Sequence, residues 1–280
     1  MINEIITSRQ NPRVKAACAL SDKKSRKREG QFRFDGIKLF CEALGRVNIS
    51  SVFVRYPANK AIIDAVNAAT DSGYISEKNV FYVAESVFEK LTDESSPEGI
   101  VTVSEYADTL HKDASDDTAE KLRGKRLLIL ESVRDPGNLG TVMRSCAALG
   151  IDTLVMSDDC ADIYNPKTLR SAMGAIFKMP TVSVKSAELP SCIGELRKSG
   201  RRVYAAALCE GAERIGELEL CSEDCFVIGN EGHGLSSDVI NACDRAAIIP
   251  MIEGNESLNA SAAATICIWE TVRAVAKEEQ

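Results

Sequence analysis

Short, almost wholly apolar runs alternate with helix-like segments through the second half of the chain. The runs cover residues 127–130, 152–157, 181–184, 202–208, 224–228 and 246–250, and the helical segments cover 139–149, 166–177, 189–199, 235–242 and 257–277. A strand that is apolar on both sides is buried on both faces, and strands that alternate with helices form parallel sheets. We therefore predict a parallel-sheet α/β domain over residues 125–280, with any ligand at the carboxyl ends of its strands.

A smaller set of alternating elements precedes this domain. Predicted strands at 52–56, 80–83 and 99–103 enclose predicted helices at 60–69 and 84–91. These elements indicate a small α/β domain over residues 1–105. Residues 106–124 are rich in aspartate and hold little that could pack in a core, so we expect a linker or a surface helix there.

The charge of the chain is unevenly distributed. Its net charge is −7 over 280 residues, which taken alone argues against a polyanionic partner. Residues 1–38, however, carry ten basic and four acidic side chains, a local net charge of +6. This polarity suits a localised phosphate-binding face, although a basic run is more often a solvated helix surface. Phe32 and Phe34 follow the basic run directly, and for this reason we favour the phosphate-binding face.

The cysteines indicate the redox compartment. All ten are scattered, and no CxxC pair occurs. The N-terminal residues lack the basic-then-apolar plan of a signal peptide, and no apolar run reaches the roughly 20 residues needed to span a bilayer. We therefore expect free thiols, several of them buried, in a protein of the reducing cytoplasm.

Three polar, glycine-containing loops follow predicted strands of the second domain. They cover residues 133–144, 228–236 and 249–261. Glycine lets a backbone approach a ligand closely, so these loops predict a site that holds a small ligand largely through main-chain groups. The polar residues in them also have simpler explanations. Asn138 would serve as a helix cap, Arg144 as a surface residue and Glu231 as a favourable charge at a helix start.

Other chemistries lack their motifs. The two histidines, His111 and His233, do not have the spacing of a metal pair, and Cys221 and Cys225 have no partner pair. There is no Gly-Lys-Ser/Thr phosphate loop, no GxGxxG fingerprint and no GxSxG elbow. We therefore expect neither a metal site nor a serine-hydrolase triad.

Taken together and in this order, the three loops closely resemble the signature motifs of the SpoU/TrmH family of RNA ribose 2′-O-methyltransferases. The resemblance extends to residues 170–175, and residues 8–15 and 34–38 are similar to the family's accessory RNA-substrate-binding domain. It implies a ribosomal-protein-like first domain and a second domain whose C-terminal part is threaded into a deep trefoil knot, an exception to the usual unknotted chain. It also implies S-adenosylmethionine as the cofactor, RNA as the substrate and a homodimer as the assembly.

The positions that match the family's motifs imply a division of roles. The polar active-site set is Asn138, Arg144, Glu231 and Asn259, and we hypothesise that Arg144 contacts the ribose 2′-hydroxyl and the adjacent phosphate. Because an arginine normally stays protonated, it either assists proton loss or stabilises the alkoxide. The residues expected at the cofactor are Leu208, Gly229, Ile249, Met251 and Leu258, and those expected at the RNA are Arg9, Lys15, Lys38, Arg134 and Arg170.

Within this family, the sequence indicates the RNA substrate less closely than it indicates the reaction. The accessory N-terminal domain favours large-subunit (23S) ribosomal RNA, because minimal family members that act on tRNA often lack it. A tRNA ribose methyltransferase and a non-catalytic RNA-binding or ribosome-assembly protein are the alternatives.

Overall fold

The structure is a computed structural model that describes residues 4–107, 110–112, 118–252 and 257–278. The tip of the third polar loop, with Gly254 and Asn255, lies outside the described residues. The chain divides into two compact units: residues 1–108 with 164–177, and residues 109–163 with 178–280.

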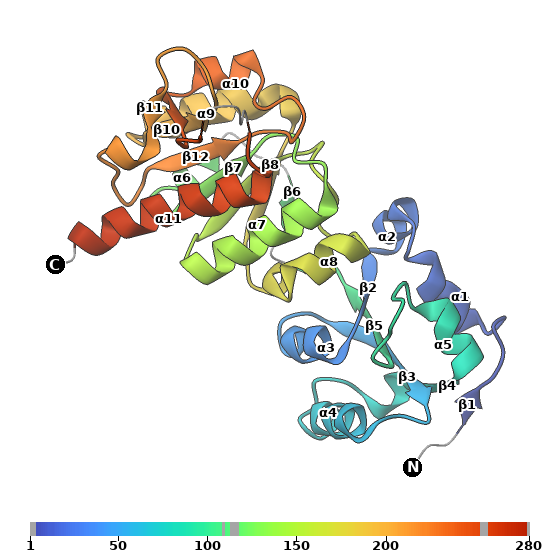
Figure 1. Cartoon of the computed structure of the whole chain (residues 1–280). Coiled ribbons are helices and arrows are strands. Elements are labelled where there is room, and N and C mark those ends of the chain that lie inside the picture. The colour runs from blue at the N-terminus through green and yellow to red at the C-terminus, as the bar shows by residue number, and fades with distance from the viewer. Residues whose placement is uncertain (1–3, 108–109, 113–117, 253–256, 279–280) are drawn as a thin grey trace. The chain divides into compact units, whose positions relative to one another are not determined.

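The first unit is built on a five-stranded mixed sheet (Figure 1). Its strand order is β1 (Ile5–Ile6), β4 (Val80–Ala84), β3 (Ile49–Tyr56), β5 (Ile100–Glu105) and β2 (Gln31–Asp35). β1, β4 and β3 are mutually parallel, whereas β5 runs antiparallel to both β3 and β2. Helices α1 (Pro12–Ala19) and α5 (Glu85–Leu91) cover one face, and α3 (Ile37–Ala43) and α4 (Lys60–Asp71) cover the other. The remaining elements of this unit are α2 (Lys23–Glu29), α8 (Pro166–Ala172) and the short turns of 3₁₀-helix Glu77–Asn79 and Ala175–Phe177.

The two phenylalanines after the basic run lie in the core, so they give no reason to favour a phosphate-binding face over a solvated helix surface. Phe32 and Phe34 are 0% and 2% exposed, and the ring centroid of Phe32 lies 4.5 Å from that of Tyr164. They occupy β2, a strand that we did not predict from the sequence although its polar and aromatic residues alternate, which is the pattern of a strand. Arg26 and Arg33 are buried as well; Arg26 donates to the Leu20 carbonyl and Arg33 pairs with Asp93.

The second unit confirms the predicted parallel sheet. Its eight strands lie in the order β11, β13, β10, β12, β7, β8, β9 and β6, and every neighbouring pair is parallel. Their bounds are β6 (Leu110–Lys112), β7 (Leu127–Leu130), β8 (Thr153–Ser157), β9 (Thr181–Val184), β10 (Val203–Ala206), β11 (Glu213–Arg214), β12 (Cys225–Ile228) and β13 (Arg245–Ile248).

Helices cover both faces of this sheet, as the apolar strands require. α7 (Pro136–Leu149) and α11 (Ala260–Glu278) lie side by side on one face, and α9 (Leu189–Lys198) and α10 (Ser237–Ala242) lie together on the other (Figure 1). In β7, Leu127 and Ile129 join the core cluster under α9 and α10, while Leu128 is equally buried on the opposite side of the strand. The unit also contains α6 (Thr118–Lys121) and the 3₁₀ turns Ser186–Glu188 and Ile215–Glu217.

The structure differs from the expected organisation in two places. Within the segment expected as a linker, β6 pairs with β9 as an edge strand, and Leu122 is 2% exposed in the core. Sheet pairing uses backbone groups, so the acidic composition of this segment concealed it. The helix expected over 166–177 ends at Ala172, because Met173 adopts a left-handed backbone (φ +50°), and the segment packs with the first unit.

All ten cysteines are free, and five of them are buried, which confirms the expectation for the thiols. Burial raises the pKa of the Cys225 and Cys267 thiols to about 12. Within the described part of the chain, no helix is long and apolar enough to cross a membrane, and no group of three or more His, Cys, Asp or Glu side chains is placed to hold a metal ion.

Candidate active site

The loops expected at the cofactor follow three neighbouring strands. Leu208 comes after β10, Gly229 after β12 and Ile249 after β13, and these strands lie in the order β13, β10, β12. The carboxyl ends of parallel strands meet at one edge of a sheet, so the three loops share that edge. Leu208 and Leu258 are 65% and 42% exposed there, so their side chains offer apolar surface that a ligand can cover.

The glycine after β12 is required by its own loop. A Cβ atom on Gly229 would lie 2.4 Å from the carbonyl carbon of Gly234, far inside contact distance. The loop folds back because Asn230 and Gly234 exchange two backbone hydrogen bonds of 3.0 and 2.9 Å. The absence of a side chain on Gly229 therefore makes room for the backbone of Gly234. A contact between Gly229 and the cofactor stays a prediction.

A chain of side-chain hydrogen bonds joins the three polar loops predicted from the sequence, which follow β7, β12 and β13. The Asn138 side-chain amide (Nδ2) donates to Glu231 at 3.0 Å, and the amide of Asn259 donates to Asn138 Oδ1 at 2.9 Å. Asn138 lies in the first turn of α7 after β7, Glu231 in the loop after β12, and Asn259 directly before α11. Asn138 does not cap α7, since Asp135 does so by accepting from the Asn138 backbone amide at 2.8 Å.

Glu231 acts as the acceptor at the centre of this arrangement. Besides the Asn138 amide, its carboxylate accepts from the backbone N–H groups of Arg134 and Asp135, each at 3.3 Å. Partial burial acts to raise the pKa of Glu231, but these donated hydrogen bonds outweigh it and hold the pKa below its ordinary value. Glu231 is therefore ionised at neutral pH, and its carboxylate fixes the first polar loop by binding the backbone N–H groups of that loop.

Arg144 stands apart from the other three polar residues. It is exposed on α7, and no side chain in the described part of the chain forms a hydrogen bond or an ion pair with it. Six residues of α-helix separate it from Asn138, a rotation of about 240° and a rise of about 9 Å, so the two side chains leave different faces. The structure brings Asn138, Glu231 and Asn259 together and leaves the guanidinium of Arg144 free.

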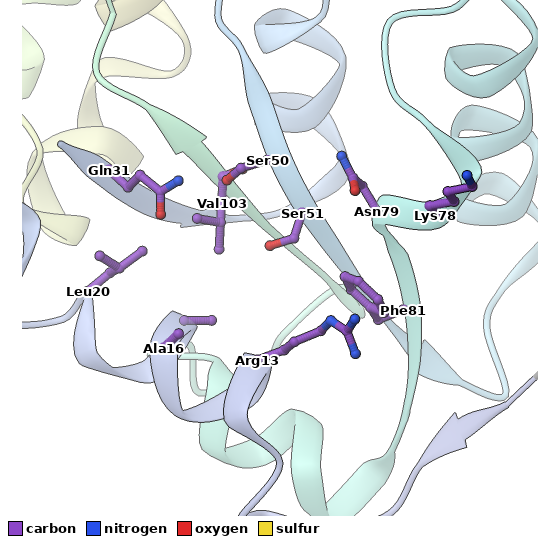
Figure 2. Close-up of a pocket in the computed structure, with 11 residues that line it drawn as sticks. Arg13, Ala16, Leu20, Gln31, Ser50, Ser51, Lys78, Asn79, Phe81 and Val103 are labelled. Atoms are coloured by element: carbon purple, nitrogen blue, oxygen red, sulfur yellow. The ribbon is translucent and has the colours of Figure 1, made fainter. Parts of the chain in front are cut away.

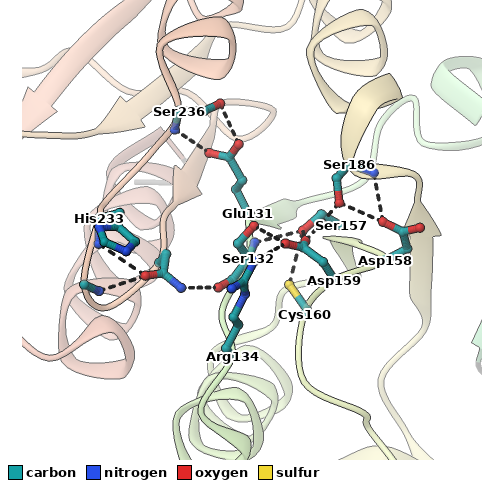
Figure 3. Close-up of polar contacts among 12 residues, drawn as sticks. Glu131, Ser132, Arg134, Ser157, Asp158, Asp159, Cys160, Ser186, His233 and Ser236 are labelled. Atoms are coloured by element: carbon teal, nitrogen blue, oxygen red, sulfur yellow. Dashed lines mark hydrogen bonds and ion pairs between the residues drawn. The ribbon is translucent and has the colours of Figure 1, made fainter.

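A second group of contacts, missed from the sequence, holds the start of the first loop (Figure 3). Asn230 donates its side-chain amide to the Ser132 carbonyl at 2.7 Å, and Glu131 accepts from the Ser236 hydroxyl at 2.6 Å. Ser132 has a left-handed backbone (φ +54°), and its hydroxyl donates to Asp159 at 2.5 Å. Asn230 and Ser236 lie within the second polar loop, residues 228–236, whereas the only sequence signal for Glu131, Ser132 and Asp159 is their position directly after apolar strands.

Asp159 gathers four donors from three segments. The hydroxyls of Ser132, Ser157 and Ser186 and the guanidinium of Arg134 all donate to its carboxylate (Figure 3). Partial burial opposes ionisation, but these hydrogen bonds outweigh it and lower the pKa of Asp159 well below its usual range. The left-handed Ser132 is therefore held by a charged acceptor on one side and by Asn230 on the other.

Comparison with known proteins decides the family. A family model described as the SpoU rRNA Methylase family matches residues 125–269. The chain belongs to this family. A second model, described as an MRM3-like substrate binding domain, matches residues 11–102.

Relatives of this SpoU methylase match it over nearly its whole length. The 23S rRNA (guanosine(2553)-2′-O)-methyltransferase RlmP of Bacillus subtilis is 31% identical over 94% of this chain and 97% of its own length. An rRNA methyltransferase structure from Sinorhizobium meliloti has a TM-score of 0.80 at 26% identity, covering 96% of this chain and 97% of that one. A structure of an rRNA methyltransferase from the same organism with AdoMet bound has a TM-score of 0.78 at 27% identity, with the same coverage.

The cations expected at RNA fall into two groups in this SpoU methylase. Three form ion pairs: Arg9 with Glu89 at 3.1 Å, Arg134 with Asp159 at 3.1 Å and Arg170 with Glu94 at 2.9 Å. Lys15 and Lys38 are exposed within the segment matched by the substrate-binding model. Exposed ion pairs are weak, so the pairing does not prevent the arginines from meeting phosphates, and their role at RNA stays a prediction.

Proposed function

We propose that this protein transfers the methyl group of S-adenosylmethionine to a ribose 2′-hydroxyl of 23S ribosomal RNA. The observation that carries the proposal is the hydrogen-bonded chain from Glu231 through Asn138 to Asn259, which ties three loops together at the carboxyl edge of a parallel sheet. Membership in the SpoU methylase family supports the reaction, and the ribosomal substrates named for its relatives support the choice of RNA.

The residues at this edge fit the proposed cofactor. Leu208 and Leu258 expose apolar side chains, which suits an adenosyl group. S-adenosylmethionine, when bound, supplies an electrophilic methyl group on a sulfonium. In our proposal Leu208, Ile249, Met251 and Leu258 cover the apolar parts of this molecule, and main-chain groups near Gly229 hold its polar parts.

Arg144 has the chemistry to act on the nucleophile. A ribose 2′-hydroxyl is a weak nucleophile. In the proposed transfer its oxygen would bond to the methyl carbon as the bond from that carbon to sulfur breaks, its proton would pass to solvent, and S-adenosylhomocysteine would leave as a neutral thioether. The guanidinium stays protonated, so its role is to donate hydrogen bonds to the developing alkoxide and the adjacent phosphate. The absence of an intramolecular partner within the described residues leaves Arg144 available for that contact. Glu231 and Asn138 position the loops and take no proton.

The finer features of fold and assembly belong to the same proposal. We infer a deep trefoil knot in the second unit; α11 follows the loop after β13 yet packs beside α7, and Asn259 bonds to Asn138. We also infer a homodimer built around α11, supported by Trp269, which is 51% exposed on that helix.

The test of this function separates binding from turnover. Replacing Arg144 by Ala is expected to lower kcat for RNA methylation at least a hundredfold, because removing one such donor from a developing oxyanion costs about 10²–10³ in rate. S-adenosylmethionine should bind with an affinity within twofold of the parent, measured by calorimetry. Arg123→Ala is the matched control, since Arg123 has a 65% exposed side chain and precedes the amino end of β7.

Two results would contradict the assignment. Unchanged turnover of the Arg144→Ala variant removes the proposed role of the guanidinium. Loss of cofactor affinity in that variant would instead place Arg144 at the cofactor rather than at the RNA.

A further inference from the structure

A cavity of about 300 Å³ lies in the first unit, between α1 and the sheet (Figure 2). It opens near the amino ends of β3 and β4, where Ser51 and Asn79 line it, and beside Gln31 at the amino end of β2. Lys38 follows the carboxyl end of β2, at the opposite end of the same sheet. The cavity is therefore separate from Lys38, one of the residues expected to contact RNA.

One wall of the cavity is a stacked pair. The guanidinium carbon of Arg13 lies 4.8 Å from the centroid of the Phe81 ring, and Arg13 points toward that ring in Figure 2. The buried side chains of Leu20 and Val103 add apolar surface. A planar cation on an aromatic ring is a surface on which a nucleobase stacks well.

Three polar side chains of the lining have no hydrogen-bond partner among the described residues, whereas the Ser50 hydroxyl donates to the Val103 carbonyl. The side chains of Gln31, Ser51 and Asn79 form no hydrogen bond with any described residue. Two carboxamides and a hydroxyl offer both donors and acceptors, which is the requirement for reading a base edge. Ser51 and Asn79 lie near the stacked Arg13 and Phe81, so a base on that pair comes within their reach, whereas Gln31 lines the far end of the cavity, on a strand three places from that of Phe81.

The charge of the lining favours an anionic ligand. Arg13 and Lys78 are exposed cations of the lining, and no acidic residue lines the cavity. Within the described residues neither cation has an ion pair with a carboxylate. The basic surface continues from Arg13 along α1 and α2, whose exposed side chains include Lys15, Lys23, Lys24 and Lys27.

We propose that this cavity holds one unpaired nucleotide of the RNA substrate. Its base stacks on Arg13 and Phe81, the edge of the base meets Ser51 and Asn79, and its phosphate meets Lys78. The volume is at the lower end of the roughly 300–1,000 Å³ typical of ligand pockets, which suits a single nucleotide. The cavity is open and adjoins the basic surface of α1 and α2, which favours a nucleotide within an RNA strand over a free one. The proposal rests on the proposed function.

Filling the cavity is the first test. Ala16 lines it and is exposed on α1, so Ala16→Phe occupies the space without removing a polar or charged group. We expect the KM for a 23S rRNA fragment to rise about tenfold, since stacking of one base contributes roughly that factor. The kcat at saturating RNA and the Kd for S-adenosylmethionine should stay within twofold. Ala68→Phe is the matched control, because Ala68 is exposed on α4 and does not line the cavity.

Two further variants keep the proposal testable if Ala16→Phe impairs folding. Phe81→Leu retains an apolar side chain and removes the stacking ring, with the same expected rise in KM. Lys78→Ala alters an exposed side chain and should reduce the slope of log Kd against log salt by roughly 0.7–0.9, the value of one phosphate contact. Lys60→Ala, an exposed lysine in the first turn of α4, should leave that slope unchanged.

The outcomes distinguish this proposal from the proposed function. A parent protein that methylates no RNA overturns the function itself. If the parent methylates RNA and the folded Ala16→Phe and Phe81→Leu variants keep the parental KM, only the proposed role of the cavity is overturned. Titration with each of the four nucleoside 5′-monophosphates adds a third measurement. If Ala16→Phe abolishes the binding of a monophosphate but leaves the KM for RNA unchanged, the cavity binds a free nucleotide and the proposal is overturned.

Discussion

At the scale of single residues, Asp159 shows how one carboxylate can set the geometry of a neighbouring loop. It accepts from Ser132, whose left-handed backbone begins the loop that carries Asn138. Hydrogen bonds to a charged acceptor contribute about 1.5–3 kcal/mol each when they are well formed, and partial exposure reduces this. Asp159 is thus a positioning residue for the site.

Replacing Asp159 by Asn is expected to lower the free energy of unfolding by about 2 kcal/mol at pH 7. The folded-state pKa of Asp159 lies below the ordinary value of 3.8, so its contribution is present above that value and is lost as pH falls toward the folded-state pKa. Urea unfolding at pH 7, 5 and 3 should therefore show a difference between parent and variant that shrinks only below pH 4. Asp64→Asn, on the exposed face of α4, is the control. A difference that does not depend on pH would contradict this account.

The residues of the site were accessible from sequence to different degrees. Asn138, Glu231 and Asn259 could be named because they fall in motifs that resemble a known family. Asp159 could not, because it lies outside these motifs and two of its partners, Ser132 and Ser186, are each 27 residues away with no local pattern that links them. Asn230 lies within a motif, but its contact with Ser132, 98 residues away, could not be predicted. Which side chains meet across a sheet edge depends on strand order, which periodicity alone does not give.

At the scale of elements, the loop after β12 depends on one glycine. Gly229→Ala places a Cβ 2.4 Å from the Gly234 backbone, which cannot move away as a flexible side chain would. We expect a loss of at least 2 kcal/mol in unfolding free energy, at the upper part of the range for overpacked sites, together with weakened cofactor binding. Thermal unfolding and calorimetry measure both.

Gly232→Ala is the matched control in the same loop. The nearest atom to a Cβ there is Asn230 Oδ1 at 3.5 Å, an ordinary contact. The unfolding free energy of the Gly232→Ala variant should stay close to that of the parent. Equal effects of the two substitutions would mean that the approach of Gly234 to Gly229 does not decide the loop's conformation.

Most strands of the second sheet were predictable, whereas β2 of the first sheet and β6 of the second were not predicted. β7, β9 and β12 agree closely with the predicted apolar runs, because strands buried on both faces leave a continuous signal. β2 carries buried Arg33 between two phenylalanines, and β6 lies at a sheet edge in an acidic segment. In β6 tertiary pairing, which the local sequence does not report, decides the structure, whereas the short alternating pattern of β2 was present in the sequence.

At the scale of the whole molecule, the proposed homodimer gives exposed Trp269 its function. Trp269→Lys is expected to raise the dimer dissociation constant at least thirtyfold, because buried aromatic anchors contribute about 2 kcal/mol or more to interfaces. Sedimentation equilibrium at micromolar concentration measures this shift. Tyr74→Lys, at a tyrosine that is 55% exposed in the first unit, should leave the assembly unchanged. A Trp269→Lys protein with the parental dissociation constant would remove α11 from the interface.

The central claim is that the methyl group goes to a ribose oxygen of 23S rRNA. The most direct measurement incubates the purified protein with S-adenosylmethionine and unmodified 23S rRNA, then analyses the RNA by alkaline hydrolysis and nucleoside mass spectrometry. We predict a single 2′-O-methylated nucleotide whose 3′ linkage resists alkali, present with the parent protein and absent with Arg144→Ala. A methyl group on a base, or methylation of tRNA with none on 23S rRNA, would contradict the claim.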